Sequence, residues 1–276
     1  MTVVRTRADD LARHALGQRI AVLSPHLDDA VFSLGGLIAG AVRSGAEVRA
    51  VTVFGNDPDS QAPAGPWDRA CGFVSVGEGA KARRLEDERA CFLLGATPVW
   101  LSFADEEYGG PGDEAEVWAA LAEVVAWADA VFVPGFPLYH PDHAWLTEVV
   151  CRKATAVRLG LYVEQPYAAW RLIGRGHRTW TLPGLTPARG IGHALLLLFR
   201  TPAGRKLQQP VAPVVGPRWH AESWLAVRAY PRDWRAKQQA VRAYRSQLQA
   251  FGPLVPSRMA LYEAAWGGEG IALLSP

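Results

Sequence analysis

The chain has 276 residues, of which 49% are apolar and 20% charged, and its formal net charge is +2. These values are typical of a globular protein with a sizeable core, and the near-neutral charge gives no basic field for a nucleic acid. Three cysteines are too few for a disulfide framework, and no apolar run approaches the roughly 20 residues of a transmembrane helix. We therefore expect a cytoplasmic protein without a nucleic-acid partner or a transmembrane segment, and nothing supports contact with a membrane surface.

The first elements form a strand followed by a helix. A helical lead-in is expected over residues 1–18, and the apolar run at 20–23 has the length and branching of a buried strand. Apolar residues then recur at helical spacing from 31 to 44, and Gly45 is expected to end that helix. In open α/β sheets, ligands bind at the carboxyl ends of the strands. The loop between these two elements is therefore a candidate site.

This loop holds an imidazole and two carboxylates within four residues, namely His26, Asp28 and Asp29. Neighbouring carboxylates repel one another and are costly to bury unless a cation neutralises them. Nitrogen and oxygen ligands of these types suit zinc. The alternative is a solvated turn in which an aspartate caps the following helix. The metal interpretation therefore needs a second cluster.

The next elements continue the same alternation. A strand is predicted at 47–54, and Asn56 in the turn after it is a candidate substrate contact, although its turn-forming tendency explains it equally well. Residues 60–79 are rich in Gly, Pro and Ala and have no period, so we expect a long loop over the site. A helix over 80–94 and a strand over 97–103 follow.

The second polar cluster has the same context as the first. A helix at 114–129 leads to an apolar strand at 130–133, which Pro134 and its neighbouring glycine interrupt. The sequence YHPDH then occupies 139–143, ahead of a helix at 144–156. A catalytic zinc has three protein ligands and an open position. Neither cluster readily supplies three ligands, but the two together can.

Alternating strands and helices from 19 to 156 predict βαβ units with right-handed crossovers. The expected fold class is α/β, with a Rossmann-like, mostly parallel sheet flanked by helices. One further strand is predicted at 159–164. No G-x-G-x-x-G follows the first strand, so a nucleotide cofactor is not supported.

The last third of the chain changes character. We expect residues 1–164 to form an α/β metal-binding core, with 165–276 packed on it within one structural domain. Residues 165–235 are rich in aromatic residues, arginine and proline, and are predicted to shape the substrate site. Within them, the apolar run at 194–199 is interpreted as core rather than as a lipid-binding face. A helix is expected at 237–251, followed by a tail that packs back.

Taken together, the motifs SPHLDDA and YHPDH resemble the signature of the PIG-L/LmbE-like family of zinc-dependent N-deacetylases. Further matches are an R-x-x-E helix that ends in LG, an aspartate in a later loop and a late K…Y-S-Q pattern. These matches are found at Arg83, Glu86, Leu94, Gly95, Asp105, Lys237, Tyr244, Ser246 and Gln247. The first motif usually reads HPDDE, and here Leu27 and Ala30 replace its Pro and Glu. The departure leaves the metal and base positions intact.

We expect His26, Asp29 and His143 to hold one Zn²⁺ per chain, in agreement with what the resemblance implies. Asp28 beside the first ligand is the expected general base, and His140 is the expected donor to the oxyanion that forms on the attacked carbonyl. Asp142 can orient an imidazole, but the sequence leaves open whether that imidazole belongs to His140 or His143.

The resemblance also implies contacts with a sugar. Arg83 and Asp105 occupy positions where members of the family bind sugar hydroxyls, since Arg donates and Asp accepts hydrogen bonds. For Arg83 the alternative is a salt bridge on its own helix. Asn56 is the third candidate for substrate binding.

The function that the resemblance implies is hydrolysis of the N-acetyl amide of a glucosamine unit. The aromatic-rich segment favours a bulky glycoside, such as a precursor of a glycopeptide antibiotic. A small N-acetylglucosaminide of the inositol-linked or di-glucosamine type is the alternative. Hydrolysis of another bond, such as an ester, or a non-enzymatic α/β binding module also remains open. The expected partner is therefore a small-molecule glycoside, and the sequence does not predict an oligomeric state.

Overall fold

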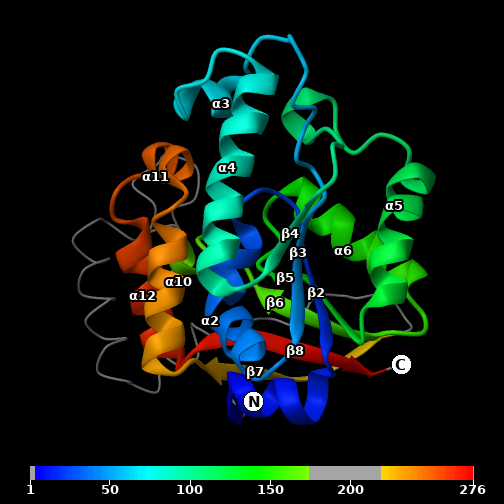
Figure 1. Ribbon diagram of the computed structural model, residues 1–276, viewed down its shortest axis with the longest axis vertical. Helices are drawn as coiled ribbons and strands as arrows, with labels where there is room; N and C mark the ends of the chain where they lie inside the picture. Colours follow the sequence, from blue (N-terminus) through cyan, green and yellow to red (C-terminus); the bar gives the residue numbers. More distant parts are fainter. Residues whose placement is uncertain (1–3, 174–218, 276) are drawn as a thin grey trace, which may run out of the picture.

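The computed structural model describes residues 4–173 and 219–275. Its central feature is one sheet of eight strands with helices on both faces (Figure 1). The strands are β1 (Val4–Arg7), β2 (Arg19–Ser24), β3 (Glu47–Thr52), β4 (Thr97–Trp100), β5 (Ala130–Phe136), β6 (Arg158–Val163), β7 (His220–Arg228) and β8 (Glu269–Ser275).

The strand order is β1-β7-β8-β6-β5-β2-β3-β4. Within it, only β8 among the described strands runs antiparallel to its neighbours. The α/β class with a mostly parallel, helix-flanked sheet is therefore confirmed. From β2 the chain moves outward through β3 and β4, then returns to β5 on the other side of β2. The carboxyl ends of β2 and β5 thus lie at the switch point of the strand order, where such sheets bind ligands.

Two helical layers cover the sheet, because successive residues of a buried strand point to opposite faces. The helices are α1 (Ala8–Leu11), α2 (Asp29–Arg43), α3 (Pro66–Ala70), α4 (Val76–Leu94), α5 (Glu114–Trp127), α6 (Pro141–Lys153), α7 (Tyr167–Ile173), α10 (Pro231–Val241), α11 (Arg245–Phe251) and α12 (Val255–Trp266). Ile20 and Val22 of β2 join the core under α1, α2, α4 and α10, whereas Ala21 and Leu23 join the core under α5 and α6. Figure 1 shows α2, α4 and α10 on one side of the sheet and α5 and α6 on the other.

The helix expected over residues 1–18 is wrong in part. Instead, β1 pairs in parallel with β7 before the short helix α1 and a π-helical turn at Ala12–Leu16. An edge strand of four residues has too few positions for its period to be recognised in the sequence.

The expected loop over 60–79 is also wrong in part. It contains α3, and α4 begins at Val76 rather than at residue 80. The Ser75 hydroxyl accepts from the Glu78 N–H at 3.2 Å, as an N-cap does, and the left-handed Gly95 ends the helix as expected.

At the second cluster, β5 continues through Pro134 with a register shift instead of stopping there. The following helix begins at Pro141, so His143 lies in its first turn rather than in front of it. Proline is well tolerated at the first position of a helix because its missing N–H would be unpaired there anyway.

The expected helix at 237–251 is two helices, α10 and α11, with a break at 242–244. The tail beyond it forms α12 and β8, and β8 lies between β6 and β7. The division of the chain at residue 164 stays a prediction, and strands from both sides of it share the sheet. The apolar run at 194–199 lies outside the described residues.

Candidate metal centre

His26 and Asp29 lie in the turn between β2 and α2, and Ser24 fixes the shape of that turn. The Ser24 hydroxyl donates to the His26 carbonyl oxygen at 2.6 Å and accepts from the Ala30 N–H at 2.9 Å. The Asp29 carboxylate accepts from the His26 N–H at 2.9 Å. These bonds satisfy N–H groups at and before the start of α2, and they bring the two side chains together.

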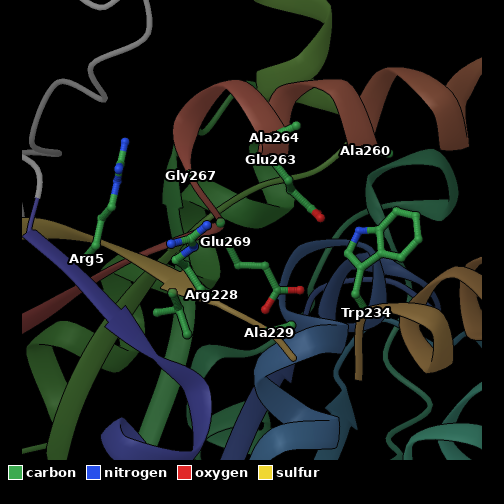
Figure 2. A pocket seen from close by; sticks show the side chains of 11 residues that line it. Arg5, Arg228, Ala229, Trp234, Ala260, Glu263, Ala264, Gly267 and Glu269 are labelled. Carbon is green, nitrogen blue, oxygen red and sulfur yellow. The ribbon is translucent and has the colours of Figure 1, made fainter. Parts of the chain in front are cut away.

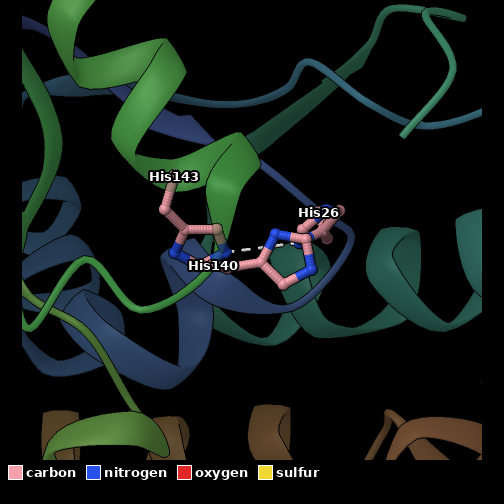
Figure 3. A group of neighbouring side chains, drawn as sticks. All are labelled: His26, His140 and His143. Carbon is pink, nitrogen blue, oxygen red and sulfur yellow. Dashed lines mark hydrogen bonds between the residues drawn. The ribbon is translucent and has the colours of Figure 1, made fainter. Parts of the chain in front are cut away.

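Three candidate ligand atoms from β2–α2 and α6 meet at the switch point. His143 Nε2 lies 3.2 Å from Asp29 Oδ2 and 3.3 Å from His26 Nδ1, and the latter two atoms are 3.4 Å apart. Figure 3 shows the imidazoles of His26 and His143 turned toward one another. Ligands held at 2.0–2.1 Å by a tetrahedral ion lie roughly 3.3 Å apart. These residues therefore fit a divalent ion without rearrangement.

His140 is close enough to be an alternative ligand. One of its ring nitrogens lies within 4.8 Å of ligand atoms of His26 and His143 (Figure 3). However, its Nδ1 accepts a hydrogen bond from the Asp142 N–H at 3.3 Å. A neutral imidazole that accepts at Nδ1 carries its proton on Nε2, so Nε2 of His140 can donate a hydrogen bond.

Asp142 orients neither of the two imidazoles that the sequence left open. Its Oδ2 lies 2.9 Å from His26 Nε2, so it is the partner of His26. The distance from the same oxygen to His140 Nδ1 is 3.7 Å, too long for a hydrogen bond. Asp142 Oδ2 also accepts from the Glu106 N–H at 3.1 Å, which connects the loop after β4 to the centre.

The partner of His143 is Glu164, a residue that was not among the site residues expected from the sequence. Glu164 Oε2 lies 2.5 Å from His143 Nδ1, and both side chains are fully buried. The signal in the sequence was an acidic residue at the end of an apolar strand, at the edge of the sheet where the other polar loops lie. Periodicity alone marked Glu164 only as the last residue of that strand.

The protonation states of His26, His143 and Asp29 depend on their burial and on the charges of their neighbours. Burial lowers the pKa of His143, but Asp29 and Glu164 outweigh it and raise that pKa to about 10. Burial likewise opposes the effect of Asp142 and Asp29 on His26, whose pKa rises to about 9. The two imidazoles keep the pKa of Asp29 well below its usual range despite its burial. A divalent cation must therefore displace protons here, so its affinity should rise with pH.

The pKa values of Asp28 and His140 shift in the directions opposite to those of Asp29 and of the other two histidines. Burial raises the pKa of Asp28, and the Asp29 charge raises it further. Burial also lowers the pKa of His140 to about 4, with help from His26 and His143. A nearby cation favours the ionised form of a carboxylate, so an ion at this centre would hold Asp28 ready to accept a proton.

Arg83 is buried on α4, and its Nη2 lies 3.2 Å from Asp68 Oδ1 on α3. This ion pair joins two helices, in contrast to the salt bridge on its own helix that the sequence suggested. Asp68 also accepts from the Tyr108 hydroxyl at 2.6 Å. The Arg83 Nε atom has no hydrogen-bond partner among the described residues.

Asn56 and Asp105 are brought together from the ends of β3 and β4. Asn56 Nδ2 donates to Asp105 Oδ2 at 3.0 Å, and the Asp105 N–H donates back to Asn56 Oδ1 at 3.1 Å. Asn56 has a φ of +53°, a conformation that Asn tolerates better than most residues. The other carboxylate oxygen of Asp105 is buried and has no hydrogen-bond partner in the described part of the chain.

A separate cavity of about 240 Å³ opens between β7, α10 and α12 (Figure 2). Arg5, Arg228 and Trp234 line its sides, and Glu263 and Glu269 face it. None of the candidate site residues lines it, so this cavity is distinct from the metal centre.

In the described residues, no helix is long and apolar enough to cross a bilayer.

Comparison with known families gives a match to the one described as "PIG-L: GlcNAc-PI de-N-acetylase", over residues 21–154. The matched segment includes both polar clusters, and the resemblance expected from the motifs is confirmed. No curated protein sequence matches the chain.

Three solved structures that share the fold are deacetylases. The A40926 pseudoaglycone deacetylase Dbv21 has 24% identity and a TM-score of 0.66, over 94% of this chain and 96% of that one. A zinc-inhibited form of the teicoplanin deacetylase Orf2 has 21% identity and a TM-score of 0.65, over 93% and 98%. N,N'-diacetylchitobiose deacetylase from Pyrococcus horikoshii has 19% identity and a TM-score of 0.51, over 97% and 87%.

Proposed function

We propose that this chain, which carries a PIG-L family domain at residues 21–154, is a zinc-dependent deacetylase that hydrolyses the N-acetyl amide of a glucosamine unit. The observation that carries the proposal is the triangle of ligand atoms from His26, Asp29 and His143, with sides of 3.2–3.4 Å. A base and a hydrogen-bond donor, Asp28 and His140, lie on the same two loops.

We assign the ligand set to His26, Asp29 and His143, with one Zn²⁺ per chain. The atoms of this set have the separations of a tetrahedral face, whereas the ligand atoms of the set that includes His140 lie up to 4.8 Å apart. With Asp29 as a ligand, one negative charge lies beside the dication, whereas a set of three neutral imidazoles would supply none. The lower net charge of the buried centre favours retention of the dication. His140 then remains free to act on the substrate.

When bound, the ion would lower the pKa of a water molecule and polarise the amide carbonyl. Asp28 takes the proton of the attacking water and transfers it to the nitrogen of the departing amine, as a general base and then a general acid. His140 donates its Nε2 proton in a hydrogen bond to the oxygen that becomes negative during attack. Asp142 keeps Nδ1 of His26 available by holding its Nε2.

The substrate contacts are proposed with different roles. Asp105 has a carboxylate oxygen without a hydrogen-bond partner among the described residues and would accept from a sugar hydroxyl. Asn56 uses both ends of its amide on Asp105, so we assign it the role of orienting that carboxylate. Arg83 would donate from its guanidinium while Asp68 holds it in place.

We infer that the sugar is part of a bulky glycoside, such as a glycopeptide-antibiotic precursor. Two deacetylases of that class align over more than nine-tenths of both chains. The chitobiose deacetylase supports the smaller alternative, with a lower TM-score. The three cysteines are free and buried, which suits the reducing cytoplasm proposed as the location.

The test combines metal analysis with acetate release. Purified protein is expected to contain about one zinc per chain and to release acetate from an N-acetylglucosaminide, with the matching O-acetyl glycoside as the control for an esterase. A chelator should abolish release, and zinc added in steps to one equivalent should restore it. Titration is stepwise because a zinc-inhibited form of a structural relative is known. Full activity in the presence of chelator would overturn the proposal.

A further inference from the structure

Glu164 occupies the position where the sheet, the metal centre and the loop of His140 meet. It directly follows β6, its side chain is fully buried, and its N–H donates to the Phe136 carbonyl oxygen at 2.7 Å. This bond fixes the main chain of Glu164 to β5, the strand that leads into the second polar cluster. The side chain therefore extends from a rigid support toward α6.

The two carboxylate oxygens of Glu164 serve two different partners. Oε2 lies 2.5 Å from His143 Nδ1, and Oε1 accepts from the Leu138 N–H at 2.7 Å. Glu164 has 0% exposed surface, so bulk solvent does not reach its carboxylate. A buried carboxylate with two donors is satisfied only while both remain in place.

The Leu138 contact stabilises a conformation that the chain would otherwise avoid. Leu138 has a φ of +53°, a left-handed conformation in which the Cβ atom of a non-glycine residue comes too close to the following carbonyl oxygen. The loop is held in this form next to His140, which is two residues further on. The imidazole of His140 lies 4.7 Å from that of His26 and 5.3 Å from that of His143, between ring centroids.

We propose that Glu164 is a positioning residue that sets two parts of the centre with one carboxylate. Through Oε2 it keeps the proton of His143 on Nδ1, so that the lone pair of Nε2 faces His26 and Asp29. Through Oε1 it holds the loop that places His140. This inference rests on the proposed function, because Nε2 of His143 needs this orientation in order to bind the proposed zinc ion.

Only a carboxylate can accept hydrogen bonds from His143 and from Leu138 at the same time. Glutamine has nearly the same shape but cannot do so, which makes it an informative replacement. Both partners of Glu164 are donors, the Nδ1–H of His143 and the N–H of Leu138. A glutamine offers one acceptor and one NH₂ group. If its oxygen faces Leu138, its NH₂ requires an unprotonated Nδ1 and moves the His143 proton to Nε2. If its oxygen faces His143, two donors meet at Leu138.

The first experiment measures Zn²⁺ affinity without substrate, by competition with a chromophoric chelator. Glu164→Gln is expected to weaken zinc binding by about 10- to 100-fold, the range found when the partner of a ligating histidine is removed. The matched control is Glu86→Gln, because Glu86 also accepts two hydrogen bonds, from the Ser246 N–H and hydroxyl. That control should bind zinc as the unmodified protein does.

The second experiment needs no variant. In the zinc-loaded protein with ¹⁵N-labelled histidine, His143 should show a proton on Nδ1 and the nitrogen shift of a metal ligand on Nε2. The Nδ1 proton should exchange slowly with water, because the bond to Glu164 is buried. If Glu164→Gln does not fold, this spectrum still tests the assignment.

The outcomes separate this inference from the proposed function. Unchanged zinc affinity in Glu164→Gln, or a proton on Nε2 of His143 in the zinc-loaded protein, would overturn the role of Glu164 and leave the deacetylase proposal standing. Failure of the unmodified protein to bind zinc would instead remove the proposed function.

Discussion

Each imidazole of the centre has one nitrogen committed to a neighbour, and that commitment decides the role of the other nitrogen. His26 Nε2 is taken by Asp142 and His143 Nδ1 by Glu164, which leaves His26 Nδ1 and His143 Nε2 facing Asp29. His140 instead accepts a backbone N–H at Nδ1. This arrangement agrees with the proposed roles, in which His26 and His143 bind the ion and His140 donates a hydrogen bond.

Asp28→Asn tests the base at this scale. The amide keeps the size of the side chain, and Asp28 is not among the proposed ligands, so zinc content should be unchanged. An amide does not accept a proton near neutral pH, so acetate release should fall by about 10²- to 10⁴-fold. The measurement is kcat together with metal analysis of the same sample. Turnover within a few-fold of the unmodified protein would rule out Asp28 as the base.

Asp142→Asn separates orientation from catalysis. Because Asp142 Oδ2 faces His26 Nε2 at 2.9 Å, an amide there should weaken zinc binding about 10-fold or more, by loosening the His26 imidazole. Chelator competition measures this directly. A fall in kcat at saturating zinc with no change in zinc affinity would instead assign Asp142 to the reaction itself.

At the scale of elements, α2 connects the centre to the rest of the fold through a kink. Leu34 departs from helical geometry, and the N–H groups of Gly36 and Leu37 donate to the Glu269 carboxylate, both at 2.7 Å. Lys237 Nζ donates to Glu269 at 2.6 Å and to Glu263 at 2.5 Å. Glu269 thus caps the second half of α2 as a helix N-terminus is capped.

The buried carboxyl group of Glu263 should make the stability of the fold depend on pH. Burial raises the pKa of Glu263 to about 7 in the folded protein, above about 4.3 in an unfolded chain. A raised pKa contributes stability that is complete below the unfolded value and is lost as pH rises through the folded value. The free energy of unfolding should therefore lose about 1–3 kcal/mol from this group between pH 5 and pH 8.

Glu263→Gln removes that titration. The free energy of unfolding, measured with denaturant at pH 5 and at pH 8, should decrease less between these two pH values in the variant than in the unmodified protein. Equal decreases in the two proteins would show that Glu263 does not titrate in this range. The comparison is made between proteins because other groups also contribute to the total slope.

At the scale of the whole molecule, the late residues of the family pattern close the fold rather than enter the centre. The Tyr244 hydroxyl donates to Asp87 at 2.6 Å, Ser246 donates to Glu86, and Trp67 Nε1 donates to Gln247 at 3.1 Å. These bonds tie α11, or the turn before it, to α4 and α3. Within the segment expected to be a loop over the site, Trp67 provides the attachment to α11.

Zinc should increase the stability of the entire fold because the ligands proposed for it come from distant parts of the chain. A ligand present at 100 times its Kd adds about 2.7 kcal/mol to the free energy of unfolding. The thermal midpoint should then rise by roughly 5–10 °C in a chain of this length. In His143→Ala, zinc should raise the thermal midpoint much less. The rise is measured from the midpoint of the same variant without zinc. An equal rise in His143→Ala would place the stabilising ion elsewhere.

Features that depend only on neighbouring residues could be predicted before the fold was known. The strand before His26, the turn that joins His26 to Asp29 and the second cluster after β5 are local patterns. Their periodicity and hydrogen bonding act over a few residues, so the fold class and the polar strand ends could be predicted. The end of α4 at Gly95 is another local feature that was expected correctly.

Contacts between residues that are far apart in the chain became known only from the folded protein. Asp142 faces His26, Glu164 faces His143, and β8 enters the sheet between β6 and β7. None of these pairings leaves a local pattern, because each depends on the register of strands and the direction of side chains that are far apart in the chain. A carboxylate can orient any imidazole within reach, and only the folded chain determines which one that is.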